Sequence, residues 1–206
     1  LLSEHLLREY GLGYLSMGSS AESDGDYDFE FPCEPVENML QIKSHIKKQM
    51  SHPIHIIQVQ EIRTVQKCQI NAGKTFSLNS NDARKDALNR YKPDGVYGRC
   101  FCQMCHKVKS NGLIEVNNLE IKPQLYFPQM RIALCLECSK RFEELRNNQN
   151  IRDEFIKNII NANTTYKEPI DINIGSEKIS FTAKHLAEIQ EIMENVANLE
   201  KQAITV

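Results

Sequence analysis

The segment GRCFCQMCHKVKSNGLIEVNNLEIKPQLYFPQMRIALCLECSKRFEELR, residues 98–146, decides the fold prediction for this chain. It holds two CxxC pairs, formed by Cys102 with Cys105 and by Cys135 with Cys138. A CxxC turn delivers two thiolates from one short loop, and two such turns complete the tetrahedral shell that Zn²⁺ prefers. The four cysteines therefore predict a structural zinc site, because four thiolates leave no open position for water. An iron–sulfur cluster and a redox role for the cysteines are the alternatives.

The other three of the seven cysteines are placed differently. Cys100 offers a CxC alternative to the first pair, and His106 directly after that pair is a further substitute ligand. We expect both to lie beside the site, where they either support the metal ligands or pack against them. Cys33 and Cys68 are expected to be small buried hydrophobic residues.

Length and composition describe an ordinary globular chain. Its 206 residues are 41% hydrophobic, which suffices for one large domain or two small ones. It has no apolar run long enough to cross a membrane and no secretion signal, so we expect a cytoplasmic protein without membrane contact. The chain begins at Leu1 with an apolar, helix-like segment, which favours the C-terminal part of a larger bacterial protein.

Charge is distributed unevenly along the chain, although its net value is only −2. Acidic residues outnumber basic ones nine to one in residues 1–40. Basic residues outnumber acidic ones 18 to nine in residues 41–146. A basic middle could contact phosphates, whereas charge blocks of this size are more often solvated faces or contact each other within one fold.

The pattern predicts an α+β fold in three parts. Residues 1–96 form a mixed N-terminal part, residues 97–147 a small zinc-stabilised module of treble-clef or ββα type, and residues 148–206 a helix, hairpin and helix. Helices are expected over residues 2–10, over Pro35 to Met50 and over Asn81 to Tyr91 with a Ser80 cap, and strands between Pro53 and Leu78 with a turn at Asn71 to Lys74.

The second half of the chain gives sharper predictions. A strand is expected over Leu113 to Asn118, and helices over Ser139 to Arg146 and Asp153 to Ala162. IDINIGSEKISF predicts a hairpin that turns at Gly175 and Ser176. Thr182 is expected to cap a final helix whose apolar stripe is Leu186, Ile189, Ile192, Met193 and Val196.

Residues 97–147 resemble the zinc-bound subclass of HNH endonuclease modules. Those modules place a first CxxC on a knuckle, then a strand that ends in an acidic-apolar-His-His stretch before a proline. Their second CxxC opens a helix. Here the knuckle is Cys102 to Cys105, the strand is Leu113 to Asn118, Pro123 follows, and the second pair precedes a helical stretch. The resemblance implies a compact nuclease-like scaffold built around one zinc ion.

The chain departs from that family at every expected catalytic position. Asn117 and Asn118 replace the paired histidines, Met130 replaces an asparagine, and Ser139 replaces the histidine after the second pair. An amide cannot act as a base near neutral pH, and a thioether is a poor ligand for magnesium. We therefore predict a degenerate, non-catalytic module that recognises protein or nucleic acid. The alternative is a nuclease that acts on DNA through displaced groups such as His106 or His185.

Basic side chains near the cysteines are the candidates for nucleic-acid contact. Tyr126 and Phe127 are available to stack on bases. The alternative is a solvated helix face, because several glutamates share the helix after the second pair. The expected partner is a protein, the remainder of a larger chain, or DNA. The candidate phosphate contacts are Lys107, Lys109, Arg131, Lys140 and Arg141.

A second resemblance is confined to one short segment. Gly11, Gly13 and Ser16 in EYGLGYLSMGSS are similar to the lid glycines of GHKL-type ATPases, including sacsin-like bacterial proteins. A loop is the simpler interpretation of so short a match. The association implies only that the chain could trail such an ATPase.

Overall fold

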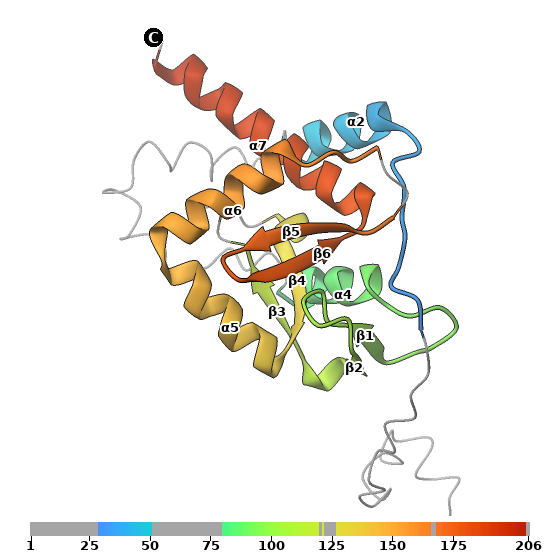
Figure 1. The fold of residues 1–206 in the computed structure, drawn as a ribbon. Coiled ribbons are helices and arrows are strands. Elements are labelled where there is room, and N and C mark those ends of the chain that lie inside the picture. Colours follow the sequence, from blue (N-terminus) through green and yellow to red (C-terminus); the bar gives the residue numbers. More distant parts are fainter. Residues whose placement is uncertain (1–28, 51–79, 120, 122–126, 166–167, 205–206) are drawn as a thin grey trace, which may run out of the picture.

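The computed structural model describes residues 29–50, 80–119, 121, 127–165 and 168–204. These residues adopt an α+β fold, as the sequence predicts, with helices around three two-stranded antiparallel sheets (Figure 1). The predicted helix over residues 2–10 and the predicted strands and turn of residues 53–78 lie outside the described residues.

The helices are α2 (Met39–Met50), α4 (Ser80–Arg90), α5 (Leu136–Asn147), α6 (Gln149–Asn161) and α7 (Ala183–Ile204). The strands are β1 (Arg99–Phe101), β2 (Val108–Ser110), β3 (Ile114–Asn118), β4 (Arg131–Cys135), β5 (Ile170–Ile174) and β6 (Glu177–Phe181), with short 3₁₀ turns η3 (Asn111–Leu113) and η4 (Pro128–Met130).

β3 and β4 form the strand pair that carries the second half of the cysteine motif. They run antiparallel, with Ile114 opposite Cys135 and Asn118 opposite Arg131. α5 begins directly after β4, so residues 114–147 make a strand, strand and helix unit of the predicted ββα type. The predicted strand is correct to within one residue, and the predicted helix lies inside α5.

β1 and β2 form a separate hairpin that is fastened to β3 by α4. The hairpin pairs residues 99–101 with residues 108–110. From α4, the Nη2 of Arg84 donates to the backbone oxygens of Asn111 and Ile114, each at 2.8 Å. The guanidinium of Arg84 therefore holds the end of the β1–β2 hairpin against the start of β3.

The third hairpin, β5 and β6, turns at Gly175 and Ser176 as predicted. Gly175 has a φ of +59°, which a residue with a side chain rarely adopts. A Cβ at this position would also lie 3.0 Å from Cδ2 of Leu145 and 3.3 Å from Cδ1 of Ile151. Both the backbone angle and the close packing on α5 and α6 therefore require glycine.

The predicted start of α2 is wrong by four residues. α2 begins at Met39 rather than at Pro35. The reason is Asn38, whose Oδ1 accepts hydrogen bonds from the backbone N–H groups of Leu40 (3.0 Å) and Gln41 (3.2 Å). An asparagine in this role ends the extended segment and begins the helix, so Pro35 lies in the segment before the helix.

The predicted start of α6 is also four residues away from the observed start. α6 begins at Gln149, whereas the periodicity places the first turn at Asp153. The Oδ1 of Asn148 accepts from the backbone N–H groups of Asn150 (3.1 Å) and Ile151 (3.4 Å). Asn148 is also the C-terminal cap of α5, where its own N–H donates to the backbone oxygen of Leu145. One residue therefore ends one helix and begins the next.

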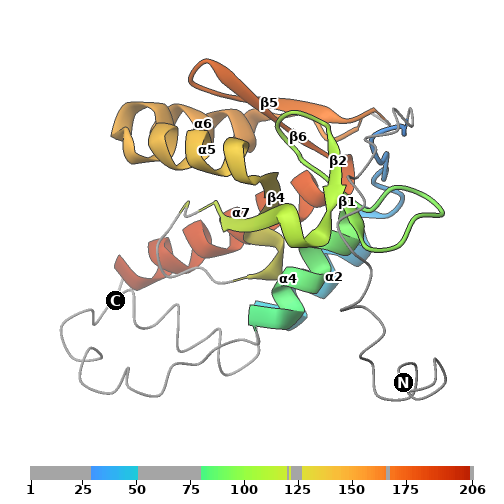
Figure 2. The same ribbon diagram turned by 90° about the horizontal axis from the view of Figure 1, so that it is seen from below.

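α7 contributes the predicted apolar stripe to the core, and α2 packs along it (Figures 1 and 2). Thr182 Oγ1 accepts from the His185 N–H at 3.3 Å, as expected for its capping role. The stripe residues Leu186, Ile189, Ile192 and Val196 have no exposed surface, and Met193 is partly buried.

Nearly all buried apolar side chains of the described residues belong to one cluster. It includes Ile46 of α2, Tyr91 after α4, Ile132 of β4 and Ile192 of α7, so all three parts predicted from the sequence contribute to it. The boundaries of those parts stay a prediction. Among the helices that the structure describes, none combines the length and the apolar character that a membrane span needs.

Candidate metal centre

The first cysteine pair lies in the turn between β1 and β2. The turn is closed by two backbone hydrogen bonds, from His106 N to Cys102 O (2.9 Å) and from Cys102 N to Lys107 O (3.0 Å). His106 has a φ of +59°, a left-handed conformation that reverses the chain after Cys105. The knuckle therefore brings the two cysteines of the first pair to one side of a single short turn.

The second pair lies where β4 becomes α5. Cys135 is both the last residue of β4 and the N-terminal cap residue of α5. Cys138 follows in the first turn of that helix and is almost fully buried. The free N–H groups at a helix N-terminus carry partial positive charge, which partly offsets the cost of placing thiolate charge at this position.

The structure brings the two pairs together. The four Sγ atoms of Cys102, Cys105, Cys135 and Cys138 all lie within 4.8 Å of one another. The Cys105 and Cys135 sulfurs are 3.9 Å apart, and the four cysteines are free. A zinc ion with Zn–S bonds of about 2.3 Å would place its sulfurs about 3.8 Å apart, so the geometry fits a tetrahedral ion. These four cysteines could hold a metal ion.

The thiols of the cluster differ in acidity. A hydrogen bond from the Cys102 thiol lowers the pKa of Cys105 to about 5, and the same bond raises the pKa of Cys102. Burial raises the pKa of Cys138 to about 12. A cation that binds all four sulfurs must therefore displace protons from the more basic thiols, which makes its affinity fall as the pH falls.

Neither substitute ligand belongs to the cluster. Cys100 is fully buried on β1, and its Sγ lies 3.3 Å from the backbone oxygen of Phe101. The Nε2 of His106 lies 2.6 Å from Oγ of Ser180 on β6. The prediction that Cys33 is buried is wrong, because its side chain is exposed, and Cys68 lies outside the described residues.

Two of the four positions that would be catalytic in an HNH module lie together at the junction of β3 and α5. Ser139 Oγ donates to Oε2 of Glu115 at 2.5 Å, and it accepts from Nδ2 of Asn117 at 3.1 Å. The other two positions, Asn118 and Met130, are buried, with 8% and 1% of their surface exposed. A base with a free lone pair for water is therefore not among these side chains.

The two histidines proposed as displaced catalytic groups are already hydrogen bonded. His185 has no exposed surface, and its ring nitrogens contact the Tyr91 hydroxyl and the Gln129 backbone oxygen, each at 2.7 Å. His106 is exposed, but its Nε2 is held by Ser180. His185 is therefore out of reach of a substrate, which its place in the α7 stripe, four residues before Ile189, would have indicated.

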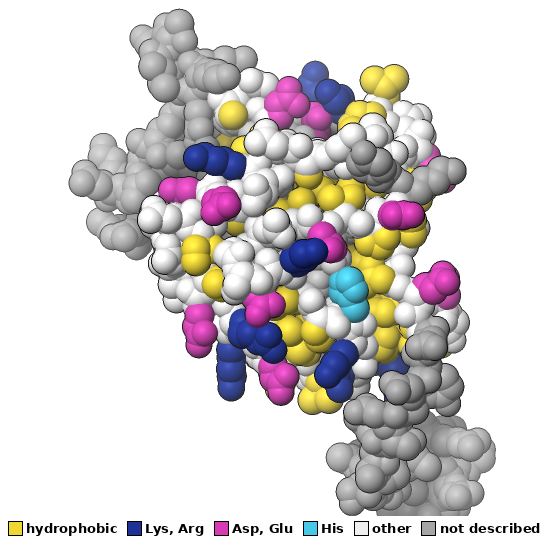
Figure 3. All heavy atoms as spheres, viewed as in Figure 1, with side chains coloured by type: hydrophobic (Ala, Val, Ile, Leu, Met, Phe, Trp, Pro, Cys, Tyr) yellow, Lys and Arg dark blue, Asp and Glu magenta, His cyan; other side chains and the backbone are white. Residues whose placement is uncertain are grey.

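The predicted nucleic-acid contacts do not form a uniformly basic surface. Arg141 on α5 forms an ion pair with Glu177 of β6 (Nη1 to Oε1, 3.2 Å), and this partner raises the pKa of Arg141. Lys107 and Lys140 are exposed, whereas Lys109 and Arg131 are half-buried. On the face shown in Figure 3, Lys and Arg side chains alternate with Asp and Glu side chains.

The predicted stacking residues do not support base contact either. Phe127 has no exposed surface, because it packs into the core, so its prediction as a stacking residue is wrong. Tyr126 lies outside the described residues. The described part of the cysteine-bearing segment therefore offers cations but not this aromatic platform.

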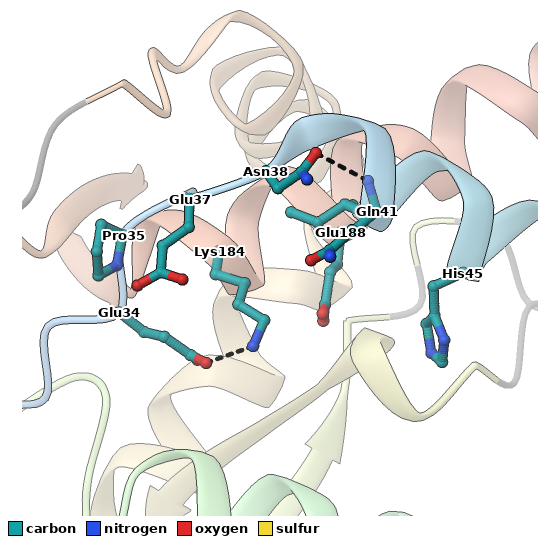
Figure 4. A pocket seen from close by; sticks show the side chains of 9 residues that line it. Glu34, Pro35, Glu37, Asn38, Gln41, His45, Lys184 and Glu188 are labelled. Atoms are coloured by element: carbon teal, nitrogen blue, oxygen red, sulfur yellow. Dashed lines mark hydrogen bonds and ion pairs between the residues drawn. The ribbon is translucent and has the colours of Figure 1, made fainter.

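A pocket of about 400 Å³ lies away from the cysteines, between residues 34–38, α2 and the start of α7 (Figure 4). Lys184 forms an ion pair with Glu34 across its mouth, and Glu188 at its wall pairs with Arg90 (3.2 Å). Burial raises the pKa of Glu188. None of the four cysteines lines the pocket. Its lining residues are Glu34, Pro35, Glu37, Asn38, Gln41, Ile42, His45, Lys184 and Glu188.

Three properties of this chain together define the candidate metal centre: its paired CxxC turns, the convergence of four sulfurs, and the position of the second pair at the N-terminus of α5. The likeness of residues 97–147 to HNH modules, and the weaker one to GHKL-type ATPases, remain predictions. No protein-family model, curated protein or solved structure matches the chain.

Proposed function

We propose that this chain is a non-catalytic recognition module held together by one structural zinc ion on Cys102, Cys105, Cys135 and Cys138. The observation that carries the proposal is the convergence of their four sulfur atoms within 4.8 Å. Four soft thiolates in a tetrahedral set favour Zn²⁺, and they leave no coordination position for a reacting water. A reducing compartment such as the cytoplasm keeps these thiols available to the metal.

The absence of nuclease chemistry is supported by the junction of β3 and α5. Hydrolysis of a phosphodiester needs a general base and ligands for a second, catalytic cation. The hydroxyl of Ser139 is instead committed to Glu115 and Asn117. In this proposal the scaffold of an HNH-like module is kept for its shape, and its reaction is lost.

A protein surface is the partner that the charges favour, whether it belongs to another molecule or to another part of a longer chain. Arg141 is neutralised by Glu177, and Lys178 pairs with Asp171 at 3.4 Å. A surface that binds DNA without sequence preference needs unpaired cations, since release of condensed counterions provides its affinity. DNA is the second candidate, because Lys107 and Lys140 remain exposed.

The test combines metal analysis with a binding assay on the full chain. We expect one zinc per chain by elemental analysis and native mass spectrometry, and loss of the metal in Cys135→Ser. Cys33→Ser is the matched control, because it removes an exposed thiol outside the cluster. Zinc-free wild type, or zinc retained in full by Cys135→Ser, would contradict the proposal.

The same preparation tests the absence of catalysis and the nature of the partner. Incubation of DNA with the protein and added magnesium or manganese should leave the DNA intact. Cleavage that disappears in His106→Ala would establish the nuclease alternative. A gel shift at low salt that is lost at moderate salt and in Lys107→Glu with Lys140→Glu would identify DNA as the partner instead.

A further inference from the structure

Gln103, the first residue inside the CQMC turn, is fully buried although it is polar. Such a side chain is stable in a core only when each of its polar groups has a partner. Gln103 meets this condition completely. Its backbone N donates to Ala133 O (2.9 Å), and its side-chain Oε1 accepts from Ala133 N (2.8 Å). Its backbone O accepts from Ser180 N (2.7 Å), and its Nε2 donates to Ser180 O (2.9 Å).

These four hydrogen bonds join parts of the fold that belong to different sheets. Ala133 lies on β4, two residues before the metal-site Cys135, and Ser180 lies on β6 of the third hairpin. Gln103 itself lies between Cys102 and Cys105. The residue therefore sets the distance between the two cysteine pairs on one side, and it fastens the β5–β6 hairpin to the knuckle on the other.

Further contacts repeat the connection between the knuckle and the hairpin. The Nε2 of His106 lies 2.6 Å from Oγ of Ser180, and that hydroxyl donates to Oδ1 of Asp171 on β5 at 2.6 Å. Arg141, three residues after Cys138, pairs with Glu177 at the start of β6. Both cysteine-bearing segments thus contact the same hairpin.

We infer that Gln103 is a positioning residue that couples zinc binding to the docking of the β5–β6 hairpin. This inference rests on the proposed zinc function and deepens it. An ion that fixes the knuckle also fixes the groups of Gln103 that bind Ser180, so zinc stabilises the docked hairpin. By thermodynamic reciprocity, the docked hairpin strengthens zinc binding to the same degree. A hairpin that contributes no metal ligand thereby becomes part of the metal site's affinity.

Gln103→Met tests the inference, because methionine keeps the length of the side chain and removes both of its hydrogen-bonding groups. Removal of a group that orients metal ligands typically lowers metal affinity about tenfold to hundredfold, and we expect a loss in this range. Zinc affinity is measured by competition with a chelator of known affinity, and the visible spectrum of the Co²⁺-substituted protein reports the ligand geometry.

Gln190→Met is the matched control. The Nε2 of Gln190 donates to the backbone oxygens of Ile159 (2.8 Å) and Ala162 (2.9 Å), with a longer contact to that of Ile160 (3.4 Å), so this variant also loses its side-chain hydrogen bonds. Its site joins α7 to α6 and does not touch the knuckle. We expect it to lower stability and to leave zinc affinity unchanged. Equal zinc affinities in Gln103→Met and wild type, or an equal loss in Gln190→Met, would overturn the coupling.

Hydrogen exchange of the wild-type chain gives a second test, which stands even if Gln103→Met does not fold. Zinc should slow exchange of the Ser180 amide, which donates to Gln103, by about tenfold or more. Zinc binding without any change at this amide would refute the inference and leave the zinc proposal standing. A wild-type chain that binds no zinc would instead remove both.

Discussion

The Tyr91 hydroxyl and Nδ1 of His185, 94 residues apart in the chain, lie 2.7 Å from each other in the core. The opposite ring nitrogen of His185 contacts the backbone oxygen of Gln129, which can only accept a hydrogen bond. Nε2 of His185 must therefore carry the proton, and Nδ1 accepts from Tyr91. The hydroxyl oxygen of Tyr91 accepts in turn from Thr182 N at 3.4 Å. The neutral imidazole is thus the form that the core requires.

This arrangement predicts a loss of stability in mild acid. Burial, with a smaller contribution from Arg90, holds the pKa of His185 well below its usual range. The unfolded chain therefore binds a proton near pH 6.5 that the folded chain does not bind. The stability from neutral His185 is fully present above pH 6.5, and it falls by up to about 1.4 kcal/mol per pH unit as the pH drops toward the lowered pKa.

Urea unfolding at several values between pH 7.5 and pH 5 measures this effect. The decrease should be smaller in His185→Gln than in wild type, whereas the exposed His45→Gln should behave as wild type. Burial raises the pKa of Glu188, which contributes in the opposite direction, with stability present at low pH and lost as the pH rises. Comparison of His185→Gln with wild type cancels this contribution, because both chains keep Glu188 and His45. Parallel pH profiles for His185→Gln and wild type would contradict the prediction.

Removal of the zinc ion proposed above should unfold at least the part of the chain around the cysteines. Structural zinc contributes roughly 10 to 16 kcal/mol of apparent binding free energy in small modules, which exceeds the total stability of many domains. A strong chelator should therefore abolish the cooperative thermal transition, followed by circular dichroism. Cys138→Ser should behave like the chelated wild type, and Cys33→Ser like the zinc-bound protein. An unchanged transition after verified metal removal would show that the core of α2 and α7 suffices.

Gly175→Ala should destabilise the third hairpin by about 1 to 3 kcal/mol, because it forces a side chain into a left-handed backbone conformation. The added Cβ would also press on Leu145 and Ile151. Gly112→Ala is the matched control, since its Cβ would meet nothing closer than 4.0 Å and its φ is not in that region. Equal urea midpoints for the two variants would refute this account of the turn.

Asn148→Ala should cost about 1 kcal/mol, the typical value for loss of an N-terminal cap. Its carboxamide oxygen serves two backbone N–H groups at the start of α6. Asn150→Ala changes the same residue type two positions later, inside the helix, and should be neutral or slightly stabilising because alanine favours helix. The difference in unfolding free energy between these variants isolates the cap.

Local sequence patterns predict much of this molecule. The CxxC pairs, the turn at Gly175 and the stripe of α7 each depend on residues close together in the chain, and the structure has the cysteine cluster, the hairpin and the buried stripe. The starts of α2 and α6 were harder to predict, because several nearby residues can begin a helix. The structure uses Asn38 and Asn148 as the caps. The predicted starts at Pro35 and Asp153 were each four residues away from the observed starts.

Contacts between distant residues were beyond sequence reasoning. In the sequence, Gln103 is a polar residue between two cysteines with no sign of a structural role. Its role depends on hydrogen bonds to Ala133 and to Ser180, which lies 77 residues away. Phe127 looks like a surface aromatic beside Tyr126, yet tertiary packing buries it. The position of the Ser139 hydroxyl between Glu115 and Asn117 likewise depends on the packing of α5 against β3. The spacing of the cysteines in the sequence does not specify this packing.

The place of Cys135 at the junction of β4 and α5 has a consequence for the order of folding. Each cysteine pair is local, so either one can capture an ion in the unfolded chain before any long-range contact forms. Capture by the second pair then closes the loop of residues 106–134, and the entropy cost of that closure, about 3 to 4 kcal/mol, is well below the roughly 10 to 16 kcal/mol of structural zinc binding. We expect the ion to act as a folding nucleus, with β3, β4 and α5 assembling around it before α2 meets α7.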